Sequence, residues 1–409
     1  MEEDRAVAFA GRAQVTAVSA RNRRRQHGPS IDPLKWFDDP CELAGSPEID
    51  VFVELMGGAD GPAKRAVEIA LSHGKPVVTA NKALLAEHGR ALAKLAEDNG
   101  ASLRFEAAVA GGVPIIKVMR EALRVDEINS VAGILNGTCN YILTEMERKG
   151  LSFADALADA QALGYAEADP TFDVGGIDAG HKIAILAALA FRAAPDFNAL
   201  RIEGIERIEA VDIQYARELG YRIKLIASAR VATGGVIQRC NPVLLPLEHP
   251  LAKIDGALNA IVIDSATRGR LTFAGAGAGG APTAAAVAAD LIDLLAEAKR
   301  SVFGQNIAAL ANLSQGEAPD STGQFYMRLR LRDRPGAIAS VSETLARHNV
   351  SIDSFLQKTV TDAAGVPIVV TTHDVSENVL RRCVTELAAL DTVVGAPCVM
   401  PMEPAASAA

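Results

Sequence analysis

The sequence predicts an α/β protein with three parts: a nucleotide-binding domain (1–112), an α+β domain (113–281) and a small C-terminal domain (324–402). Apolar strands alternate with helices in the first part, which is typical of a parallel sheet covered on both faces. The second part carries longer strand patterns without that alternation, and the third has the order βαββαβ. With 409 residues, 49% of them hydrophobic, the chain is long enough for two or three cores.

The first domain is predicted to contain four strands with helices between them. The strands fall at 13–19, 49–58, 75–82 and 101–112, and a helix at 282–305 is expected to return to this domain. Parallel sheets bind ligands beyond the carboxyl ends of their strands. Here these ends, "SARNRRR", "ELMGG", "TANK" and "AVAGG", all change abruptly from apolar to polar residues or glycine. We interpret them as a nucleotide site that includes Thr79 and Asn81, although loops are polar in any protein.

The end of the first strand indicates which dinucleotide would bind. An acid at this place holds the ribose diol of NAD, whereas an arginine accommodates the 2′-phosphate of NADP. "SARNRRR" has arginines and no acid, so Arg21 is the expected 2′-phosphate contact, and the other arginines fit a solvated basic loop. The GxGxxG turn that holds a pyrophosphate is not found, and Gly11 stands alone. We therefore expect the first strand of the fold and its glycine turn to be missing, about thirty residues by the size of a βαβ unit.

"GYAEADPTFDVGGIDAGHK" (164–182) is the segment with the strongest chemical signal. If a helix begins at Ile177, Asp178 and Lys182 lie four residues apart on one face, and the apolar run that follows predicts burial. Burial lowers the pKa of a lysine and a nearby carboxylate raises it, a balance that suits a proton-transfer group. The alternative is an ordinary surface pair worth about 0.3–0.5 kcal/mol. Gly175 and Gly176, which would let a ligand approach the backbone closely, favour a functional site.

Additional charged residues predict a zwitterionic substrate. Glu167 and Asp173 lie in the same segment, whereas Asp169, directly before a proline, fits turn chemistry. Lys82 lies just after the strand "PVVTA" and opens a helix, where a cation meets an unfavourable dipole. The alternative is that Lys82 is an ordinary surface lysine without a function. Acids would bind an ammonium group, and Lys82 and Lys182 a carboxylate or carbonyl.

Composition excludes several classes of protein. A net charge of −9 argues against a general nucleic-acid binder, no run of apolar residues is long enough to span a membrane, and "MEEDR" is unlike a signal peptide. The cysteines are odd in number, widely separated and without metal-ligand spacing, which predicts reduced thiols in a cytoplasmic protein; they are Cys41, Cys139, Cys240, Cys383 and Cys398. The polar segment 312–323 is predicted to be a linker.

Five segments in this order resemble the homoserine dehydrogenase family. They are "VVTANKALLA", "RFEAAVAGGVPII", "GILNGTCNYILT", "GYAEADPTFDVGGIDAGHK" and "GAGAGGAPTA", and the C-terminal segment with "DRPGAIA" resembles an ACT domain. The resemblance covers nearly the whole chain. It implies a Rossmann-like nucleotide domain, a domain for substrate binding and dimerisation, and an ACT regulatory domain. The implied reaction is the NAD(P)-dependent interconversion of L-aspartate 4-semialdehyde and L-homoserine, on the path to threonine and methionine.

The resemblance also implies residue roles. Lys182 matches the proton donor to the carbonyl oxygen, and Lys82 matches a lysine between the substrate and the nicotinamide. Substrate-binding residues are implied at Glu167, Asp178, Asp173, Tyr165, Gly137 and Thr138. Cofactor contacts are implied at Gly164 and Gly279, and a sodium site, made largely of backbone carbonyls, at Glu106, Val109, Gly111 and Val113. A threonine effector at the ACT domain and a homodimer or homotetramer are implied as well.

Two other functions stay open on sequence alone. One is a related NAD(P)-dependent amino-acid dehydrogenase, which turnover of homoserine against aspartate would separate. The other is an amino-acid-sensing protein that keeps the ACT domain and has lost catalysis together with the glycine turn. Such a protein would bind threonine and not NADPH.

Overall fold

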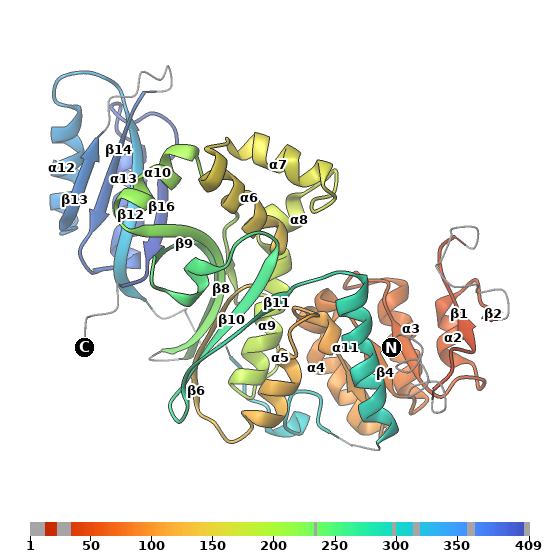
Figure 1. Cartoon of the computed structure of the whole chain (residues 1–409). Helices are drawn as coiled ribbons and strands as arrows, with labels where there is room; N and C mark the ends of the chain where they lie inside the picture. The colour runs from red at the N-terminus through yellow and green to blue at the C-terminus, as the bar shows by residue number, and fades with distance from the viewer. Residues whose placement is uncertain are drawn as a thin grey trace. The chain divides into compact units, whose positions relative to one another are not determined.

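A computed structural model describes residues 13–22, 34–232, 235–296, 300–313, 320–357 and 365–404. The chain forms two compact units. The first comprises residues 1–128, 184–198 and 275–313, and the second comprises 129–183, 199–274 and 314–409. Of the predicted linker, residues 314–319 lie outside the described part. Figure 1 shows the elements of both units, and each unit is described separately below.

The first unit contains a parallel sheet with the strand order β3-β4-β5. β3 (Phe52–Glu54) pairs with β4 (Val77–Thr79), which pairs with β5 (Leu103–Arg104). Each of the first two strands is followed by a helix, α3 (Pro62–Ser72) and α4 (Lys82–Asp98), as the alternating pattern predicts. The fourth predicted strand is much shorter than expected. After Arg104 the chain turns into the 3₁₀ helix η1 (Glu106–Ala108), because the Glu106 amide donates to the buried carboxylate of Asp290.

The first predicted strand lies in another sheet. Only Ala17–Val18 (β1) is extended in 13–19, and it pairs in parallel with Lys35–Trp36 (β2) in a separate two-stranded sheet. The expectation that this strand joins the parallel sheet is therefore wrong. Its partner is a two-residue strand just before α2 (Pro40–Gly45), too short to show an apolar pattern. Arg23, Arg24 and Arg25 lie outside the described residues.

Helical segments complete the first unit. The short helix α5 (Ile115–Lys117) continues into one π-helical turn, η2 (Val118–Ala122). α11 (Gly280–Leu295) is grouped with this unit, and its Asp290 is fully buried. The ring of Phe303, beyond α11, packs on Phe105 with ring centroids 5.6 Å apart. The core of this unit thus joins residues that are about 200 positions apart in the sequence.

The second unit is built on a mixed sheet with the strand order β11-β10-β6-β8-β9-β16-β12-β14-β13. Its first part uses β6 (Ile128–Ile134), β8 (Tyr221–Ala232), β9 (Gly235–Pro246), β10 (Leu258–Ser265) and β11 (Gly269–Ala276), with β7 (Arg201–Ile202) beside β9. β8 and β9 form a long antiparallel hairpin. The helices are α6 (Gly137–Lys149), α7 (Phe153–Ala162), α8 (Thr171–Val174), α10 (Ala210–Glu218), η3 (Pro250–Lys253) and the first half of α9 (Ile177–Ala190), whose residues from Ala184 onward are grouped with the first unit.

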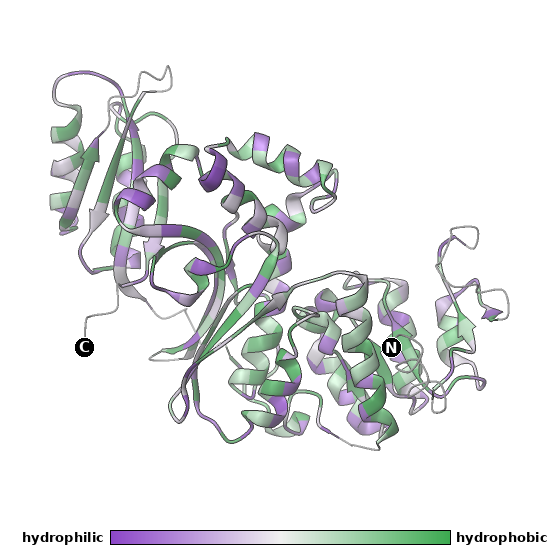
Figure 2. Ribbon diagram, viewed as in Figure 1, coloured by the Kyte–Doolittle hydropathy of each residue, from purple (hydrophilic) through white to green (hydrophobic). Residues whose placement is uncertain are grey.

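α9 is the most buried of these helices. It begins at Ile177, as the sequence predicts, and residues 183–188 are fully buried. Figure 2 shows hydrophobic colour along most of its length. A helix that is apolar all round belongs in a core, so the charged residues of its first turn are held against a rigid element.

The C-terminal part has the predicted βαββαβ order. It runs through β12 (Thr322–Leu331), α12 (Ala337–Arg347), β13 (Ile352–Gln357), β14 (Val366–Thr372), the short β15 (Val375–Ser376), α13 (Glu377–Ala388) and β16 (Cys398–Met402). The helices pack over an apolar core that includes Met327 and Leu380. β16 also pairs in parallel with β9 at Met402 and Leu244, so the two parts of this unit share one sheet.

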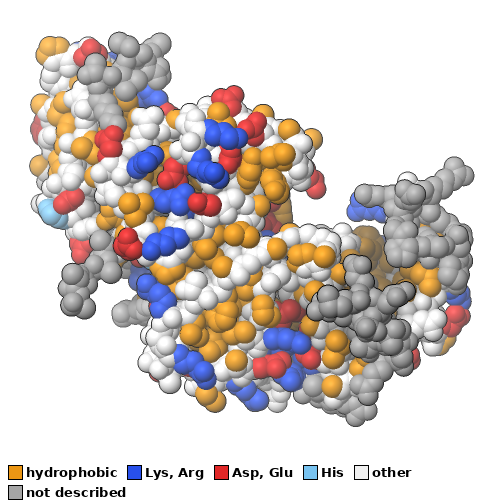
Figure 3. All heavy atoms as spheres, in the orientation of Figure 1, with side chains coloured by type: hydrophobic (Ala, Val, Ile, Leu, Met, Phe, Trp, Pro, Cys, Tyr) orange, Lys and Arg blue, Asp and Glu red, His pale blue; other side chains and the backbone are white. Residues whose placement is uncertain are grey.

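Surface charges on the face shown in Figure 3 are mixed in sign. Basic and acidic side chains are interspersed over the region of β8 and β9. No helix among the described residues is long and apolar enough to cross a membrane. All five cysteines are free thiols, and only Cys41 is not buried.

Candidate active site

The turn between β6 and α6 forms one wall of the candidate site. Asn136 is the N-cap of α6, where its side-chain oxygen accepts a hydrogen bond from the Cys139 amide at 2.8 Å. Gly137 follows because a Cβ atom there would lie 2.7 Å from the carbonyl oxygen of Ala257. The sequence "NGT" is thus explained by a cap and a close backbone approach, and both fix the position of the Leu135 carbonyl.

The structure brings Lys182, Asp178 and Asp173 together around Asn136. Lys182 Nζ donates to Asp178 Oδ2 at 2.8 Å and to the Leu135 carbonyl at 2.7 Å. The Asn136 amide nitrogen donates to Asp178 Oδ2 at 2.9 Å and to Asp173 Oδ1 at 2.8 Å. Lys182 is 8% exposed and Asp178 4% exposed. The predicted i,i+4 pair is therefore buried. The small energy of an exposed surface salt bridge does not describe it.

The two glycines before α9 have a structural reason. A Cβ atom on Gly175 would lie 2.6 Å from the Thr171 carbonyl, and one on Gly176, at φ +82°, 3.2 Å from Cys240 Sγ and from Ile202 Cγ2. Protein atoms approach these glycines closely, so the tight turn from α8 into α9 requires them. The interpretation of them as a ligand contact stays a prediction.

The remaining predicted substrate residues lie at the start of α6 and after α7. Thr138 Oγ1 donates to the Tyr165 carbonyl at 2.7 Å, which joins two of them. The ring of Tyr165 is half exposed and packs on Tyr141 with centroids 4.9 Å apart. Glu167 is exposed. Asp169 accepts a hydrogen bond from the Thr171 amide at 3.1 Å, which is the turn chemistry expected there.

In the first unit, Glu54 organises the carboxyl edge of the sheet. This fully buried acid accepts hydrogen bonds from the amides of Met56 and Gly57 and from Thr79 Oγ1 at 2.6 Å. Asn81 donates to the carbonyl of Gly58 at 2.8 Å. Sequence reasoning missed Glu54, although an acid inside the apolar run "IDVFVEL" was the signal that could have found it.

The predicted cofactor residues of the first unit occupy this edge and two separate turns. Lys82 is the first residue of α4 and half-buried, and the Asn81 side chain caps that helix through the Leu84 amide. Gly279, at φ +125°, precedes α11, and Arg21 is exposed. Gly164 belongs to the second unit, where it adopts φ +76° after α7.

The predicted sodium segment is a buried, tight turn. The Glu106 carboxylate accepts hydrogen bonds from the amides of Ile116 at 3.0 Å and Lys117 at 2.8 Å, and burial raises its pKa to about 7. Val109 and Val113 are buried, Gly111 is partly buried, and Ala110 between them adopts φ +46°. Among the described residues, the side chains grouped closely enough to share a metal ion lie elsewhere, at Asp60, Glu87 and His88.

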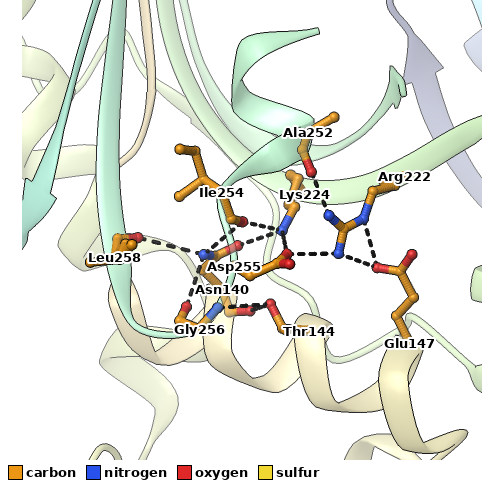
Figure 4. A network of polar contacts seen from close by, with 10 residues as sticks. All are labelled: Asn140, Thr144, Glu147, Arg222, Lys224, Ala252, Ile254, Asp255, Gly256 and Leu258. Carbon is orange, nitrogen blue, oxygen red and sulfur yellow. Dashed lines mark hydrogen bonds and ion pairs between the residues drawn. The ribbon is translucent and has the colours of Figure 1, made fainter. Parts of the chain in front are cut away.

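A second polar network lies one helical turn further along α6 (Figure 4). Asn140 donates to the Gly256 carbonyl at 2.8 Å, and Lys224 Nζ donates to Asn140 Oδ1 at 2.9 Å and to the Ile254 carbonyl at 2.5 Å. Arg222 joins Glu147 and Asp255. Lys224 is 1% exposed, and burial lowers its pKa to about 8. Sequence reasoning missed this network, because the lysine lies inside a strand pattern.

Comparison with known proteins identifies the family. The sequence profile described as homoserine dehydrogenase matches residues 114–292, that of the homoserine dehydrogenase NAD binding domain matches 2–106, and that of the ACT domain matches 325–392. The homoserine dehydrogenase of Neisseria gonorrhoeae is 45% identical over 380 residues, which are 91% of this chain and 86% of that protein. The chain belongs to the homoserine dehydrogenase family.

Other homoserine dehydrogenases agree. That of Pseudomonas aeruginosa is 42% identical over 94% of this chain and 90% of its own length. The crystal structure of a homoserine dehydrogenase from Thiobacillus denitrificans aligns with a TM-score of 0.86 and 40% identity, over 94% of this chain and 89% of that one. A hyperthermophilic archaeal homoserine dehydrogenase in complex with NADPH aligns with a TM-score of 0.55 and 29% identity, over 69% of this chain and 78% of that one.

Proposed function

We propose that this homoserine dehydrogenase interconverts L-aspartate 4-semialdehyde and L-homoserine with Lys182 as the proton donor. The observation that carries the proposal is the buried ammonium group of Lys182, which is held by the Asp178 carboxylate and the Leu135 carbonyl. Two fixed acceptors set the direction of the amine. An ammonium group has three N–H donors, and the described contacts of Lys182 use two of them. The third N–H can therefore reach a substrate oxygen.

The chemistry follows from this arrangement. When hydride reaches the aldehyde carbon, negative charge develops on the carbonyl oxygen. A positioned ammonium group stabilises that charge and supplies the proton that completes the alcohol. In the reverse direction the same amine accepts the hydroxyl proton, and Asp178 keeps it oriented in both.

Substrate binding is assigned to the residues around α6 and α8. The carboxylates of Asp173 and Glu167 suit the ammonium group of the amino-acid substrate. Thr138 and Tyr165, joined by a hydrogen bond, and the backbone at Gly137 would form the adjoining wall. This assignment is supported by the contact of Asp173 with Asn136, which links the substrate-binding acids to the catalytic pair.

For the cofactor, we assign NADP(H) to the carboxyl edge of the first unit's sheet. The edge fits a dinucleotide because Gly57 and Gly58 adopt φ +79° and +88° with no atoms crowding a Cβ position on their outer side, and Glu54 fixes their loop. NADP(H) supplies the hydride. Lys82, Thr79 and Asn81 would hold its nicotinamide end, Arg21 its 2′-phosphate, and Gly164 and Gly279 would contact it. The archaeal relative solved with NADPH supports the choice of nucleotide.

For sodium, we assign the turn around Ala110. The carbonyl groups of Val109, Gly111 and Val113 would coordinate the ion beside Glu106, and the positive φ of Ala110 is backbone strain of the kind found at ligand sites. The buried carboxylate of Glu106 supports the assignment, because a cation beside it would offset the cost of its burial. A rise in melting temperature with NaCl that choline chloride does not reproduce would support this site.

The ACT domain and the outer strand of the sheet suggest regulation and assembly. We propose that threonine acts through the ACT domain. We also propose a homodimer or homotetramer, because β11 ends the sheet as an edge strand and the apolar side chain of Leu258, on the neighbouring strand β10, is 45% exposed. Sedimentation of the full chain measures the assembly.

The direct test of function is turnover. The full chain should oxidise L-homoserine with NADP⁺, with absorbance at the reduced nicotinamide band as the readout. L-aspartate should not replace homoserine. Turnover of neither compound, in a chain that binds NADPH, would reject the proposed activity.

A further inference from the structure

Two adjoining cavities of about 470 and 480 Å³ lie in the first unit, at η2, the C-terminal end of α9 and the segment 300–309 that follows α11. They share three lining residues, so they form one continuous site. Each volume is within the range of small-molecule sites, roughly 300–1,000 Å³. The charged residues of the lining are four arginines and one acid: Arg120, Arg124, Arg192, Arg300 and Glu121.

Arg120, which lines the second cavity, is a buried cation without hydrogen bonds. It is 5% exposed, and its guanidinium nitrogens have no hydrogen-bond partner among the described residues. The ring of Phe105 lies 5.9 Å from its guanidinium carbon. Burial lowers the pKa of Arg120, and Asp290, Glu106 and Glu121 oppose this only as nearby charges. A guanidinium group stays protonated in proteins, so its weakly screened positive potential favours an anion in the cavity.

An unusual piece of backbone positions this cation. Arg120 is part of the π-helical turn η2, in which the Leu123 amide donates to the Val118 carbonyl at 2.9 Å. Such a turn takes up one residue more than an α-helical turn, which rotates the side chains after it, and it is frequent at functional sites. The turn therefore decides which side chains of 118–124 face the cavities.

Arg192 reaches the first cavity from the C-terminal end of α9. It adopts φ +52°, and the next amide, that of Ala193, donates to the Ala188 carbonyl at 2.9 Å. Glycine is the usual residue at this position of a helix end, because a Cβ atom is unfavourable there. The guanidinium group of Arg192 donates to the Arg124 carbonyl at 2.8 Å. This contact holds it beside the wall that the two cavities share.

The lining defines the chemistry of a ligand. Arg300 is paired with Glu121, whereas Arg120, Arg124 and Arg192 have no ion pair with an acid among the described residues. Three such cations suit an anion with more than one negative charge, and arginine binds phosphate oxygens through parallel N–H donors. The other polar lining residues are uncharged, and none of the described lining residues is aromatic; they are Ser301, Gln305 and Asn306. The lining thus favours a compact, polar anion.

The site is separate from the edge assigned to the cofactor. Phe303 lies within the lining segment 300–309, and its ring would be 3.0 Å from a Cβ atom on Gly89 of α4. Gly89 is two turns along this helix from Lys82, or about 10 Å at 1.5 Å per residue. An anion in the cavities would therefore not occupy the nicotinamide end of the cofactor edge.

We propose that the joined cavities bind a phosphate group. Arg124, Arg192 and Ser301 donate hydrogen bonds to its oxygens, and Arg120 contributes its charge from within the wall. A bound phosphate would link η2 to the C-terminal end of α9, the helix whose first turns carry Asp178 and Lys182. The site does not depend on the proposed reaction.

The test is calorimetric titration of the full chain with inorganic phosphate at constant ionic strength, with acetate as the comparison anion. Arg124→Gln removes an exposed cation and should weaken phosphate binding by about tenfold or more. Arg120→Met, which removes the buried charge, should weaken it as well. Arg90→Gln is the matched control, since Arg90 is an exposed arginine of the same unit, on α4, and lines neither cavity.

A titration with glycerol 3-phosphate identifies the source of the phosphate group. Tighter binding of this ester than of inorganic phosphate would assign the site to a phosphorylated metabolite. Tighter binding of inorganic phosphate would assign it to the free ion. Either result supports a phosphate site, provided that Arg124→Gln weakens the binding.

The outcomes also separate this site from the proposed function. Phosphate binding that Arg124→Gln weakens and Arg90→Gln retains supports the proposal, and this pair decides alone if Arg120→Met does not fold. The proposal is rejected if the wild type does not bind phosphate, if it binds acetate equally well, or if Arg124→Gln binds phosphate as the wild type does. In the last case the phosphate lies elsewhere, for example at the cofactor edge. Homoserine turnover without phosphate binding would reject this site and retain the proposed function.

Discussion

Two buried lysines lie near the start of α6, and their surroundings differ. Lys182 donates to a carboxylate, Asp178, at 2.8 Å and to the Leu135 carbonyl. Lys224 donates to two neutral oxygens, those of Asn140 and Ile254, and its closest carboxylate, Asp255, is 3.5 Å away and half exposed. Asp255 is also shared with Arg222.

The difference suggests different roles for the two amines, although both are buried. A direct carboxylate contact keeps the charge of Lys182 compensated while it is out of water. Lys224 has only the longer pair with the half-exposed Asp255, and burial, with the charge of Arg222 adding to it, lowers its pKa to about 8. We therefore interpret the first lysine as catalytic and the second as an anchor that holds the loop 254–258 against α6.

The largest expected effect is a difference in turnover between variants of the two lysines. Lys182→Met should lower kcat for homoserine by about 10²–10⁴-fold, the usual contribution of a proton-transfer group. NADPH affinity, measured by fluorescence titration, should stay close to that of the wild type. Lys224→Met is the control of equal burial and should retain most of its turnover. Equal losses in both variants would remove the distinction.

The second effect concerns the two asparagines of the α6 turn. Asn136→Ser keeps a capping hydroxyl for α6 but is too short to reach Asp173 and Asp178. Losing hydrogen bonds to charged groups at about 1.5–3 kcal/mol predicts a fall in kcat of roughly 10–100-fold. The pH–rate profile should also move, because the carboxylates lose a donor. Asn140→Ser should lower the melting temperature instead, with its pH–rate profile unchanged.

The third effect is the pH dependence of stability in the Lys224 network. The folded pKa of Lys224, about 8, lies below its ordinary value of 10.5, so between these pH values the unfolded chain binds more protons. Stability contributed by this group is therefore lowest below pH 8 and rises toward pH 10.5, by about 3 kcal/mol in all. Urea unfolding of wild type and Lys224→Met across this range measures it. A wild-type curve that does not rise relative to the variant contradicts the prediction.

The smallest effect is expected at Asp255. Its side chain is about half exposed, and exposed pairs contribute roughly 0–1 kcal/mol. Asp255→Asn should change the free energy of unfolding by less than about 1 kcal/mol and leave turnover unchanged. A loss as large as that of Lys224→Met would show that the charge of Asp255, rather than burial, controls the network.

The elements that were predicted correctly are those whose signal lies in residues close together in the sequence. The start of α9 at Ile177 and the βαββαβ order follow from apolar spacing and turn residues, and both are confirmed. The pairing of Asp178 with Lys182 follows from helical periodicity. The segment after Arg104 was predicted as strand because its residues are apolar, whereas a buried contact with Asp290, far along the chain, turns it.

Contacts between distant residues explain what the sequence did not show. Glu54 is recognisable only once Thr79 is beside it, and Lys224 only once Asn140 faces it. β1 pairs with β2, a two-residue strand that is too short to show an apolar pattern in the sequence. The structural role of Gly175 and Gly176 was not visible, because the sequence does not reveal that Thr171 and Cys240 occupy the adjacent space.

The junction of β9 with β16 has a consequence for protein engineering. The main-chain amide of Glu403 donates to the carbonyl of Leu244, so the last described strand is attached to the long hairpin. Cutting the chain before β12 would uncover one side of β9, and an uncovered strand invites self-association. Single substitutions are therefore a cleaner way than truncation to separate sensing from catalysis in this enzyme.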